Sequence, residues 1–426
     1  MRPPSPARPA LVLAVAVALL AAYPGPADAA TLGQWTPTTS YPLQIAGDSC
    51  VVFSDVIYCM GGFDTKGKDY DNTYYAPLSA TGIGPWKPTA PYPAPVDTSS
   101  CVASGATVYC VGGENSTSVL SYVYQATLSP SGIGTWTQAA AYPQTIAAPS
   151  CVVYSGYIYC IGGIDLTGDE TASTYYASLS GGLGSWMGTT PYPFAINSEG
   201  CVVQGGYVYC VAGNEESGLP QFPVADVYYA QLSSSGIGTW TQTTAYPEAL
   251  SALSCALYSS YIYCAGGFDL NEISSDHAYV GAISQTGVSS WTNATAYPSP
   301  FDVSSCVSDF ASIYCVAGRS FNGKQLSMSN ADYYAPLLGV PPPATSTTTA
   351  SSVSTTSAVT ATSSSTTSVL ASASATSTST SARPTLTTTT APEFGGAALV
   401  STTLFALVAV VLLLRVRRPG LGTGRP

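Results

Sequence analysis

The chain has 426 residues, of which only 8% are charged, and its formal net charge is −11 at pH 7. This acidity excludes a role that depends on neutralising nucleic-acid phosphates. Two features also argue against a zinc site: the chain has one histidine, and its cysteines are spaced more widely than in zinc knuckles.

Residues 1–29 have the features of a secretory signal peptide. Arg2 and Arg8 precede an apolar run at 10–22, and a small-residue cleavage site follows at 27–29. The run is too short to span a bilayer, which disfavours the alternative of a retained anchor. We therefore expect this segment to be removed during secretion.

Residues 30–340 contain six copies of one unit. Each copy has two cysteines nine residues apart, a Tyr nine positions before the first cysteine, and a Trp six positions before that Tyr. A period of 50 to 54 residues with four short apolar segments predicts a β-propeller rather than a helical solenoid. The cysteine pairs are Cys50 with Cys59, Cys101 with Cys110, Cys151 with Cys160, Cys201 with Cys210, Cys255 with Cys264 and Cys306 with Cys315.

The third unit shows why the cysteines are nine residues apart. Its predicted strands are 151–155, 156–163, 173–180 and 185–193, with a two-residue turn at Ser155 and Gly156. Alternation outward from that turn makes Cys151 and Cys160 a non-hydrogen-bonded pair, whose side chains approach most closely. We therefore predict six disulfides, each within one hairpin, as expected for a secreted protein.

The two ends of the repeat region complement each other. Trp35 and Tyr41 form a fourth strand with no first three before it, and the last unit, after 332–337, lacks its Trp. We therefore expect a monomeric, all-β, six-bladed propeller whose N-terminal strand completes the last blade.

The second strands, which end in Gly-Gly or Ala-Gly, resemble kelch repeats. They read VIYCMGG, TVYCVGG, YIYCIGG, YVYCVAG, YIYCAGG and SIYCVAG, and the resemblance covers about 300 residues. It implies a propeller scaffold that binds more often than it catalyses. A kelch-like copper radical oxidase would need two histidines, but His277 is alone, and we interpret it as a structural replacement for a tyrosine such as Tyr175.

Acidic residues are concentrated in loops. Between residues 30 and 338 there are 21 Asp and Glu but five Lys and Arg. The loops from strand two to three, and from strand four to the next blade, open on one face. The candidate ligand residues on this face are Asp48, Asp97, Asp165, Asp169, Glu170, Glu199, Glu215, Glu216, Glu248 and Asp302.

Three interpretations of this acidic face compete. The first is a solvated face that keeps the protein soluble, and we favour it. The second is a Ca²⁺ site built from hard oxygen ligands. The third is the carboxylate pair of a glycosidase. No cofactor and no catalytic residue is predicted.

The remaining segments suggest display at a cell surface. Asn115 and Asn293 lie in N-glycosylation sequons. Residues 341–394 are rich in Ser, Thr and Pro and read as a disordered, O-glycosylated stalk. Residues 395–414 form an uncharged apolar run long enough for a transmembrane helix, followed by a basic cytoplasmic tail at 415–426. A lipid-anchor signal is the alternative for this end.

We therefore predict a single-pass type I plasma-membrane protein with an extracellular propeller. Its variable acidic loop face is expected to bind an extracellular glycan or protein without catalysis. The alternatives are an extracellular carbohydrate-active hydrolase that uses loop carboxylates and a purely structural component of the cell wall.

Overall fold

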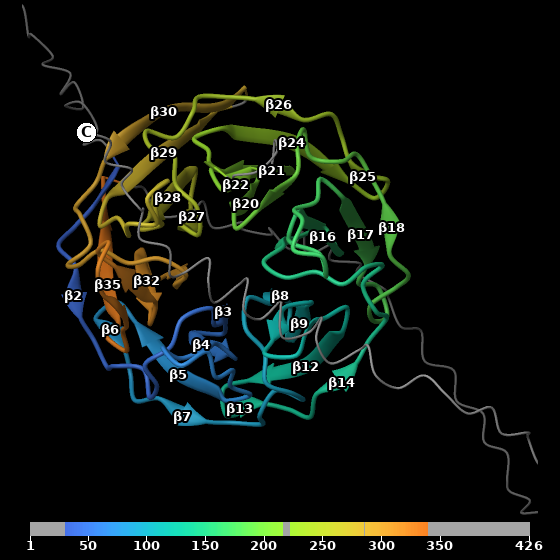
Figure 1. Ribbon diagram of the computed structural model, residues 1–426, viewed down its shortest axis with the longest axis horizontal. Coiled ribbons are helices and arrows are strands. Elements are labelled where there is room, and N and C mark those ends of the chain that lie inside the picture. The colour runs from blue at the N-terminus through green and yellow to red at the C-terminus, as the bar shows by residue number, and fades with distance from the viewer. Residues whose placement is uncertain (1–29, 216–221, 285, 340–426) are drawn as a thin grey trace, which may run out of the picture. The chain divides into compact units, whose positions relative to one another are not determined.

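The computed structural model describes residues 30–215, 222–284 and 286–339, whose regular structure is entirely β (Figure 1). The chain divides into two units, Met1–Pro343 and Ala344–Pro426, and all described residues belong to the first. The predicted signal peptide, stalk, transmembrane helix and tail lie outside the described residues. Within the described ranges, no helix is long and apolar enough to cross a membrane.

Each sequence repeat forms one antiparallel sheet of four or five strands. In the third repeat the order is β15 (Ser150–Tyr154), β16 (Tyr157–Ile161), β17 (Thr174–Ser178) and β18 (Met187–Gly188). The first three strands of the other repeats are β3 (Ser49–Phe53), β4 (Val56–Met60) and β5 (Thr73–Ser79); β8 (Ser100–Ser104), β9 (Thr107–Val111) and β12 (Val123–Ser129); β20 (Gly200–Gln204), β21 (Tyr207–Val211) and β24 (Val227–Ser233); β27 (Ser254–Tyr258), β28 (Tyr261–Ala265) and β29 (Ala278–Ser284); and β31 (Ser305–Asp309), β32 (Ser312–Val316) and β35 (Tyr333–Leu338).

The sheets are arranged as in a β-propeller. Figure 1 shows them around a common centre, with β3, β8, β20 and β27 innermost. The first strand of each repeat contacts the first strand of the next, and β3 also contacts β31. At the two ends of the repeat region, β1 (Thr31–Leu32) and β2 (Thr36–Pro37) both pair with β35. The predicted all-β, propeller-like fold is therefore confirmed.

The six predicted disulfides are also confirmed. Cys151 lies directly opposite Cys160, and the register continues to Tyr154 opposite Tyr157 beside the turn. The Cα–Cα distances of the six pairs are 4.0 to 4.1 Å, as expected for non-hydrogen-bonded partners. Each bridge closes a short loop and stabilises the fold by about 2.5 kcal/mol on the chain-entropy estimate. The bonded pairs are Cys50 with Cys59, Cys101 with Cys110, Cys151 with Cys160, Cys201 with Cys210, Cys255 with Cys264 and Cys306 with Cys315.

The fourth strand differs from the prediction. In the first repeat it is split into β6 (Gly82–Ile83) and β7 (Lys87–Pro88), with Trp86 between the two pieces. The second and fourth repeats are split in the same way, into β13 (Gly132–Ile133) and β14 (Thr137–Gln138), and β25 (Gly236–Ile237) and β26 (Thr241–Gln242). In the fifth repeat the strand is continuous, as β30 (Gly287–Asn293).

The tryptophans of the fourth strands tie each sheet to its neighbour. Trp136 Nε1 donates a hydrogen bond to the Ala90 carbonyl, at 3.2 Å, and its ring packs edge-on against Tyr92 with centroids 5.0 Å apart. All six tryptophans form both contacts with the preceding sheet, and Trp35, beside β2 in the sixth sheet, forms them with Thr295 and Tyr297 after β30. An indole that bonds to the neighbouring sheet satisfies its polar group while it buries apolar area.

One residue per repeat, three positions before the first cysteine, forms an inner ring. These residues have left-handed backbone conformations, with φ from 47° to 72°. The N–H of each donates to the carbonyl of the ring residue in the preceding repeat, and Gly47 donates to Val303 at 3.0 Å. The ring residues are Gly47, Thr98, Ala148, Ser198, Ala252 and Val303.

The Gly-Gly or Ala-Gly pair that ends each second strand makes a further link between repeats. Gly113 N–H donates to the Ile146 carbonyl of the next repeat at 2.8 Å. A Cβ on the preceding Gly112 would lie 2.2 Å from that same oxygen, and Gly112 also has a φ of +60°. In the four repeats with glycine at this position, the missing side chain allows the carbonyl to lie this close.

We expect Gly112→Ala to lower the free energy of unfolding by at least about 2 kcal/mol, because the methyl group collides with a backbone carbonyl. Ala212 occupies the same position in the fourth repeat at φ 57°. The control Ala212→Gly should therefore change stability by no more than about 1 kcal/mol. Urea denaturation of both variants tests this, and equal effects would contradict the packing argument.

Candidate functional site

The loops that follow the double glycines form what we call the loop face. In repeats one, three and five each loop is a tight turn whose Asp accepts two backbone N–H groups, as Asp165 does from Thr167 and Asp169. In repeats two, four and six the loop is a hairpin. The hairpins are β10 (Glu114–Asn115) with β11 (Ser118–Val119), β22 (Asn214–Glu215) with β23 (Phe222–Pro223), and β33 (Arg319–Phe321) with β34 (Leu326–Met328).

Each turn contacts the next repeat through a polar side chain. We call these three contacts the polar junctions. Each junction has three members. The first is a residue of the turn. The other two belong to the next repeat: the residue four positions before its first cysteine, and the residue directly after its Gly-Gly or Ala-Gly pair. Their members are Asp69, Asp97 and Glu114; Glu170, Asn197 and Asn214; and Ser274, Asp302 and Arg319.

The first junction consists of acids. Asp97 is buried, lies opposite Glu114 and shares a hydrogen bond with Asp69, whose Oδ2 also accepts the Ser116 N–H at 2.6 Å. Burial, then the charge of Glu114 and the bond with Asp69, raise the pKa of Asp97 well above its usual value. Burial and Asp69 likewise raise the pKa of Glu114. Asp97 and Glu114 therefore hold protons more tightly than exposed acids do.

One buried carboxyl group, that of Glu170, belongs to the second junction, and another, that of Glu199, lies beside it. Glu170 accepts a hydrogen bond from Asn197 Nδ2 at 2.7 Å. Glu199 lies two residues further along and is also buried, with no hydrogen-bond partner for Oε2. Burial, with a smaller contribution from the charge of Glu170, raises the pKa of Glu199 to about 8.

The third junction holds an ion pair. Asp302 is fully buried and accepts a hydrogen bond from Arg319 Nε at 2.6 Å and another from the Ser274 hydroxyl. Burial raises the pKa of Asp302, although Arg319 and Ser274 act against this. Among the described residues, this is the one carboxylate that a Lys or Arg side chain neutralises directly.

The other predicted residues are dispersed over the same face. Asp169 is exposed and accepts the Thr167 hydroxyl, while Asp165 caps its turn. Partial burial acts to raise the pKa of Asp165, but hydrogen bonds from Thr167 and Asp169 lower it below its usual value. Glu215 is half-buried on β22, and Glu216 lies outside the described residues.

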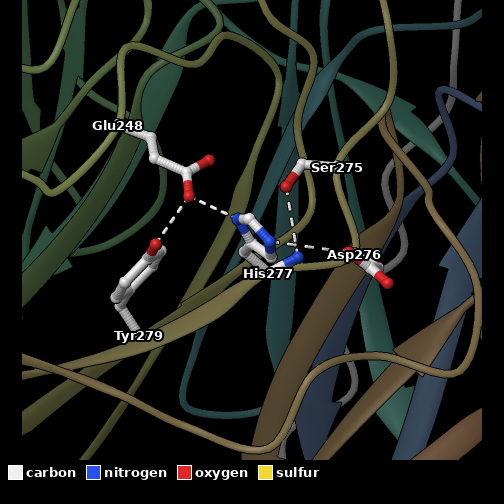
Figure 2. A network of polar contacts seen from close by, with 5 residues as sticks. All are labelled: Glu248, Ser275, Asp276, His277 and Tyr279. Carbon is white, nitrogen blue, oxygen red and sulfur yellow. Dashed lines mark hydrogen bonds and ion pairs between the residues drawn. The ribbon is translucent and has the colours of Figure 1, made fainter.

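Glu248 belongs to the polar network in Figure 2. Its Oε1 accepts the Tyr279 hydroxyl at 2.6 Å and also contacts His277 Nδ1. Burial and Glu248 together raise the pKa of Tyr279 to about 12. His277 Nε2 lies 3.9 Å from Asp276 Oδ1, and the Ser275 hydroxyl accepts the His277 backbone N–H at 3.1 Å.

The prediction for His277 was wrong in its alignment. Tyr279 lies opposite Cys264 just as Tyr175 lies opposite Cys160. His277 therefore corresponds to Ser173, at the end of the loop and not within the strand. The sequence comparison failed because the loop before it varies in length.

Asp48 is buried, and its Oδ2 lies 3.2 Å from Cys50 Sγ. Asp48, Cys50 and Cys59 bring three potential ligand atoms within 4.8 Å of one another. Both sulfurs are joined in a disulfide, so they are not thiolate ligands.

A solvated acidic face therefore describes only part of the predicted set. Asp48, Asp97, Glu170, Glu199 and Asp302 are all less than 9% exposed. They are buried because the loop of a neighbouring repeat covers them, which charge counting within one repeat does not reveal.

A hollow of about 290 Å³ opens beside the third junction. Tyr297, Phe301 and Tyr333 supply aromatic rings, and Arg319 supplies a guanidinium group. Gln44, Asn330 and four serines add further hydrogen-bonding groups (Ser299, Ser320, Ser327 and Ser329).

Both predicted glycosylation sequons lie at the surface. Asn115 is in the hairpin of the second repeat, where its Oδ1 accepts the Thr117 hydroxyl at 2.6 Å. Asn293 is exposed at the end of β30.

Several residues of these sites were not predicted, among them Ser274, Asn197 and Arg319. A signal for two of them was present, because the residue four positions before a first cysteine lies opposite the residue after the double glycine. Comparing these two positions in each repeat would have paired Asn197 with Asn214 and Asp302 with Arg319.

Comparison with known proteins adds only the fold. No family model and no curated protein matches the chain. Among solved structures, that of YjhT aligns with a TM-score of 0.56 over 68% of this chain and 95% of the other, at 13% sequence identity. A likeness at this identity shows a shared fold and carries no information on activity.

We expect Arg319→Met to lower the free energy of unfolding by about 3 to 5 kcal/mol, because it leaves Asp302 as an unpaired buried charge. The double variant Asp302→Asn with Arg319→Met should recover most of this loss. Lys324→Met, an exposed control in the same hairpin, should change stability by less than about 0.5 kcal/mol. Urea denaturation measures all three, and a double variant as unstable as the single one would contradict the assignment.

Glu199 should make stability depend on pH. Its raised pKa means that its contribution is fully present below about pH 4.5, is lost as the pH rises to about 8, and is constant above that. Glu199→Gln should therefore stabilise the protein at pH 8 relative to the parent, on the order of 3 kcal/mol, with little effect at pH 4. Thermal and urea unfolding at both pH values test this, with exposed Glu272→Gln as the control; equal stability of parent and Glu199→Gln at pH 8 would refute it.

Proposed function

We propose that residues 30–340 form a closed six-bladed kelch-type propeller that acts as a non-enzymatic binding module at the cell surface. It would be held by a stalk and a single transmembrane helix, with the propeller outside. Six disulfides support the extracellular placement, because such bonds persist in oxidising compartments. The inner ring and the pairing of β1 and β2 with β35 support the closure.

The observation that carries the binding function is the hollow beside Arg319. Aromatic side chains with a few convergent polar groups are the usual lining of a small-molecule site. Hydroxyl, amide and guanidinium groups around Tyr297 and Phe301 suit a hydroxyl-rich ligand. We infer that the hollow receives one sugar unit of an extracellular glycan.

We expect residues 30–343 to bind defined members of a glycan array, and Gln44→Trp to weaken that binding at least tenfold, because the indole would fill the hollow. Thr145→Trp, which changes the corresponding position of the third repeat, is the control and should leave binding unchanged. Binding that both variants retain, or no binding by the parent, would contradict the proposal. Release of a cleaved product, lost in Asp97→Asn, would instead indicate the hydrolase alternative.

A protein ligand is the second candidate, favoured by apolar loop tips on the same face. Leu166 and Leu270 are 53% and 60% exposed, and Ile273 is 40% exposed. Exposed apolar groups of this size often mark protein contacts. Retention of a cell-surface protein by the parent, lost in Leu270→Ser but not in Gln44→Trp, would select this candidate.

A further inference from the structure

Two buried acids meet where the last repeat joins the first. Asp332 precedes β35 in the sixth repeat and is 1% exposed, while Asp48 precedes β3 in the first repeat and is 7% exposed. Tyr41, also 1% exposed, packs edge-on against Trp86 with ring centroids 5.0 Å apart, and Trp86 Nε1–H bonds Asp332 Oδ2. Burial, then the charges of Asp48 and Asp332, raise the pKa of Tyr41. We call Asp48, Asp332 and Tyr41 the seam cluster.

The other five boundaries between neighbouring repeats show that a pair of acids at these positions is specific to the seam. The backbone carbonyl of Asp332 accepts the N–H of Thr38, which lies three positions after Trp35. In each other repeat, the residue whose carbonyl makes the same bond, to the residue three positions after a tryptophan, is the equivalent of Asp332. Equivalents of Asp48 lie two positions before the first cysteine of the next repeat. The other pairs are Thr73 with Ser99, Val123 with Pro149, Thr174 with Glu199, Val227 with Leu253, and Ala278 with Ser304.

The two acids of the seam have different partners. Asp332 Oδ1 accepts the Ala317 N–H at 3.1 Å, and Oδ2 accepts Trp86 Nε1–H at 3.0 Å. Burial raises the pKa of Asp332 well above its usual value, although these two N–H donors favour the charged form and act against the rise. Asp48 Oδ1 and the Tyr41 hydroxyl, by contrast, have no hydrogen-bond partner.

Neither a basic side chain nor a shared proton accounts for the cluster. The described residues contain five Lys and Arg, and none of them forms an ion pair with Asp48 or Asp332. No hydrogen bond joins the two carboxyl groups among the described residues, whereas acids that share one proton lie within hydrogen-bonding distance. Burial raises the pKa of Asp48 to about 8, which reflects how unfavourable its charge is without a counter-ion.

We propose that Asp48, Asp332 and Tyr41 form a site for a hard divalent cation, which in extracellular fluid is Ca²⁺. Asp48 Oδ1 and the Asp332 carboxylate supply two charged oxygen ligands, the Tyr41 hydroxyl supplies a neutral one, and water completes the shell. The ligands come from the first and sixth repeats. The cation therefore ties together the two ends of the repeat array, where the chain itself provides no peptide link.

Terbium luminescence on the full-length protein tests this proposal, because Tb³⁺ replaces Ca²⁺ and is excited by nearby aromatic rings. Trp86 and Tyr41 are both in place to sensitise it. We expect a saturable signal that Ca²⁺ displaces with a Kd of about 0.1 to 1 mM, the range of extracellular calcium modules. We also expect Tm to rise with Ca²⁺ concentration.

Asp48→Asn and Asp332→Asn should abolish both effects. Glu199→Gln is the matched control and should retain both effects. Glu199 is equivalent to Asp48, but the residue equivalent to Asp332 is there Thr174, so the second acid is missing. Trp86→Phe should weaken the Tb³⁺ signal while the rise of Tm with Ca²⁺ persists, which locates the ion without removing a carboxylate. If Ca²⁺ does not change Tm and Asp48→Asn stabilises equally with and without it, the cluster holds a proton and the proposal is wrong. Loss of both effects in Glu199→Gln would equally overturn it.

Discussion

The inner ring is the constraint on which the rest of the structure depends. Six residues with left-handed backbones, one of them the β-branched Val303, each donate a hydrogen bond to the repeat before. Such conformations are unfavourable for residues other than glycine, so they persist where the surroundings fix them. The ring sets the start of every first strand. Directly after it, the Ser49 hydroxyl accepts the N–H of Cys101 in the next repeat, and four other serines accept in the same way.

The exception to this serine pattern follows from packing. Gly200 occupies the serine position in the fourth repeat, and a Cβ there would lie 2.6 Å from Cys255 Sγ. The disulfide of the fifth repeat thus takes the space that a serine side chain would need. The disulfide of one repeat therefore limits which residue can occupy the start of the first strand in the repeat before it.

Features set within one repeat could be predicted from the sequence, and features set between repeats could not. The position of the turn at Ser155 and Gly156 fixes the pairing of Cys151 with Cys160, so local alternation is sufficient. The hydrogen bond of the Trp86 indole depends on a carbonyl in the preceding repeat. The burial of Asp97 likewise depends on Asp69 and Glu114, which lie in different loops. Counting charges along the chain locates these acids but does not reveal their surroundings.

The hollow and the seam cluster use the same short segments of chain. Ala317 lines the hollow while its N–H bonds Asp332, and Asn330 lines it while its side chain bonds the Tyr41 carbonyl at 3.2 Å. If the hollow binds a ligand and the acids bind a cation, as proposed, each ligand would order segments that the other site also uses. Because binding linkage is reciprocal, each should then strengthen the other by the same factor. The seam cluster would in that case couple the joining of the first and last repeats to recognition in the hollow.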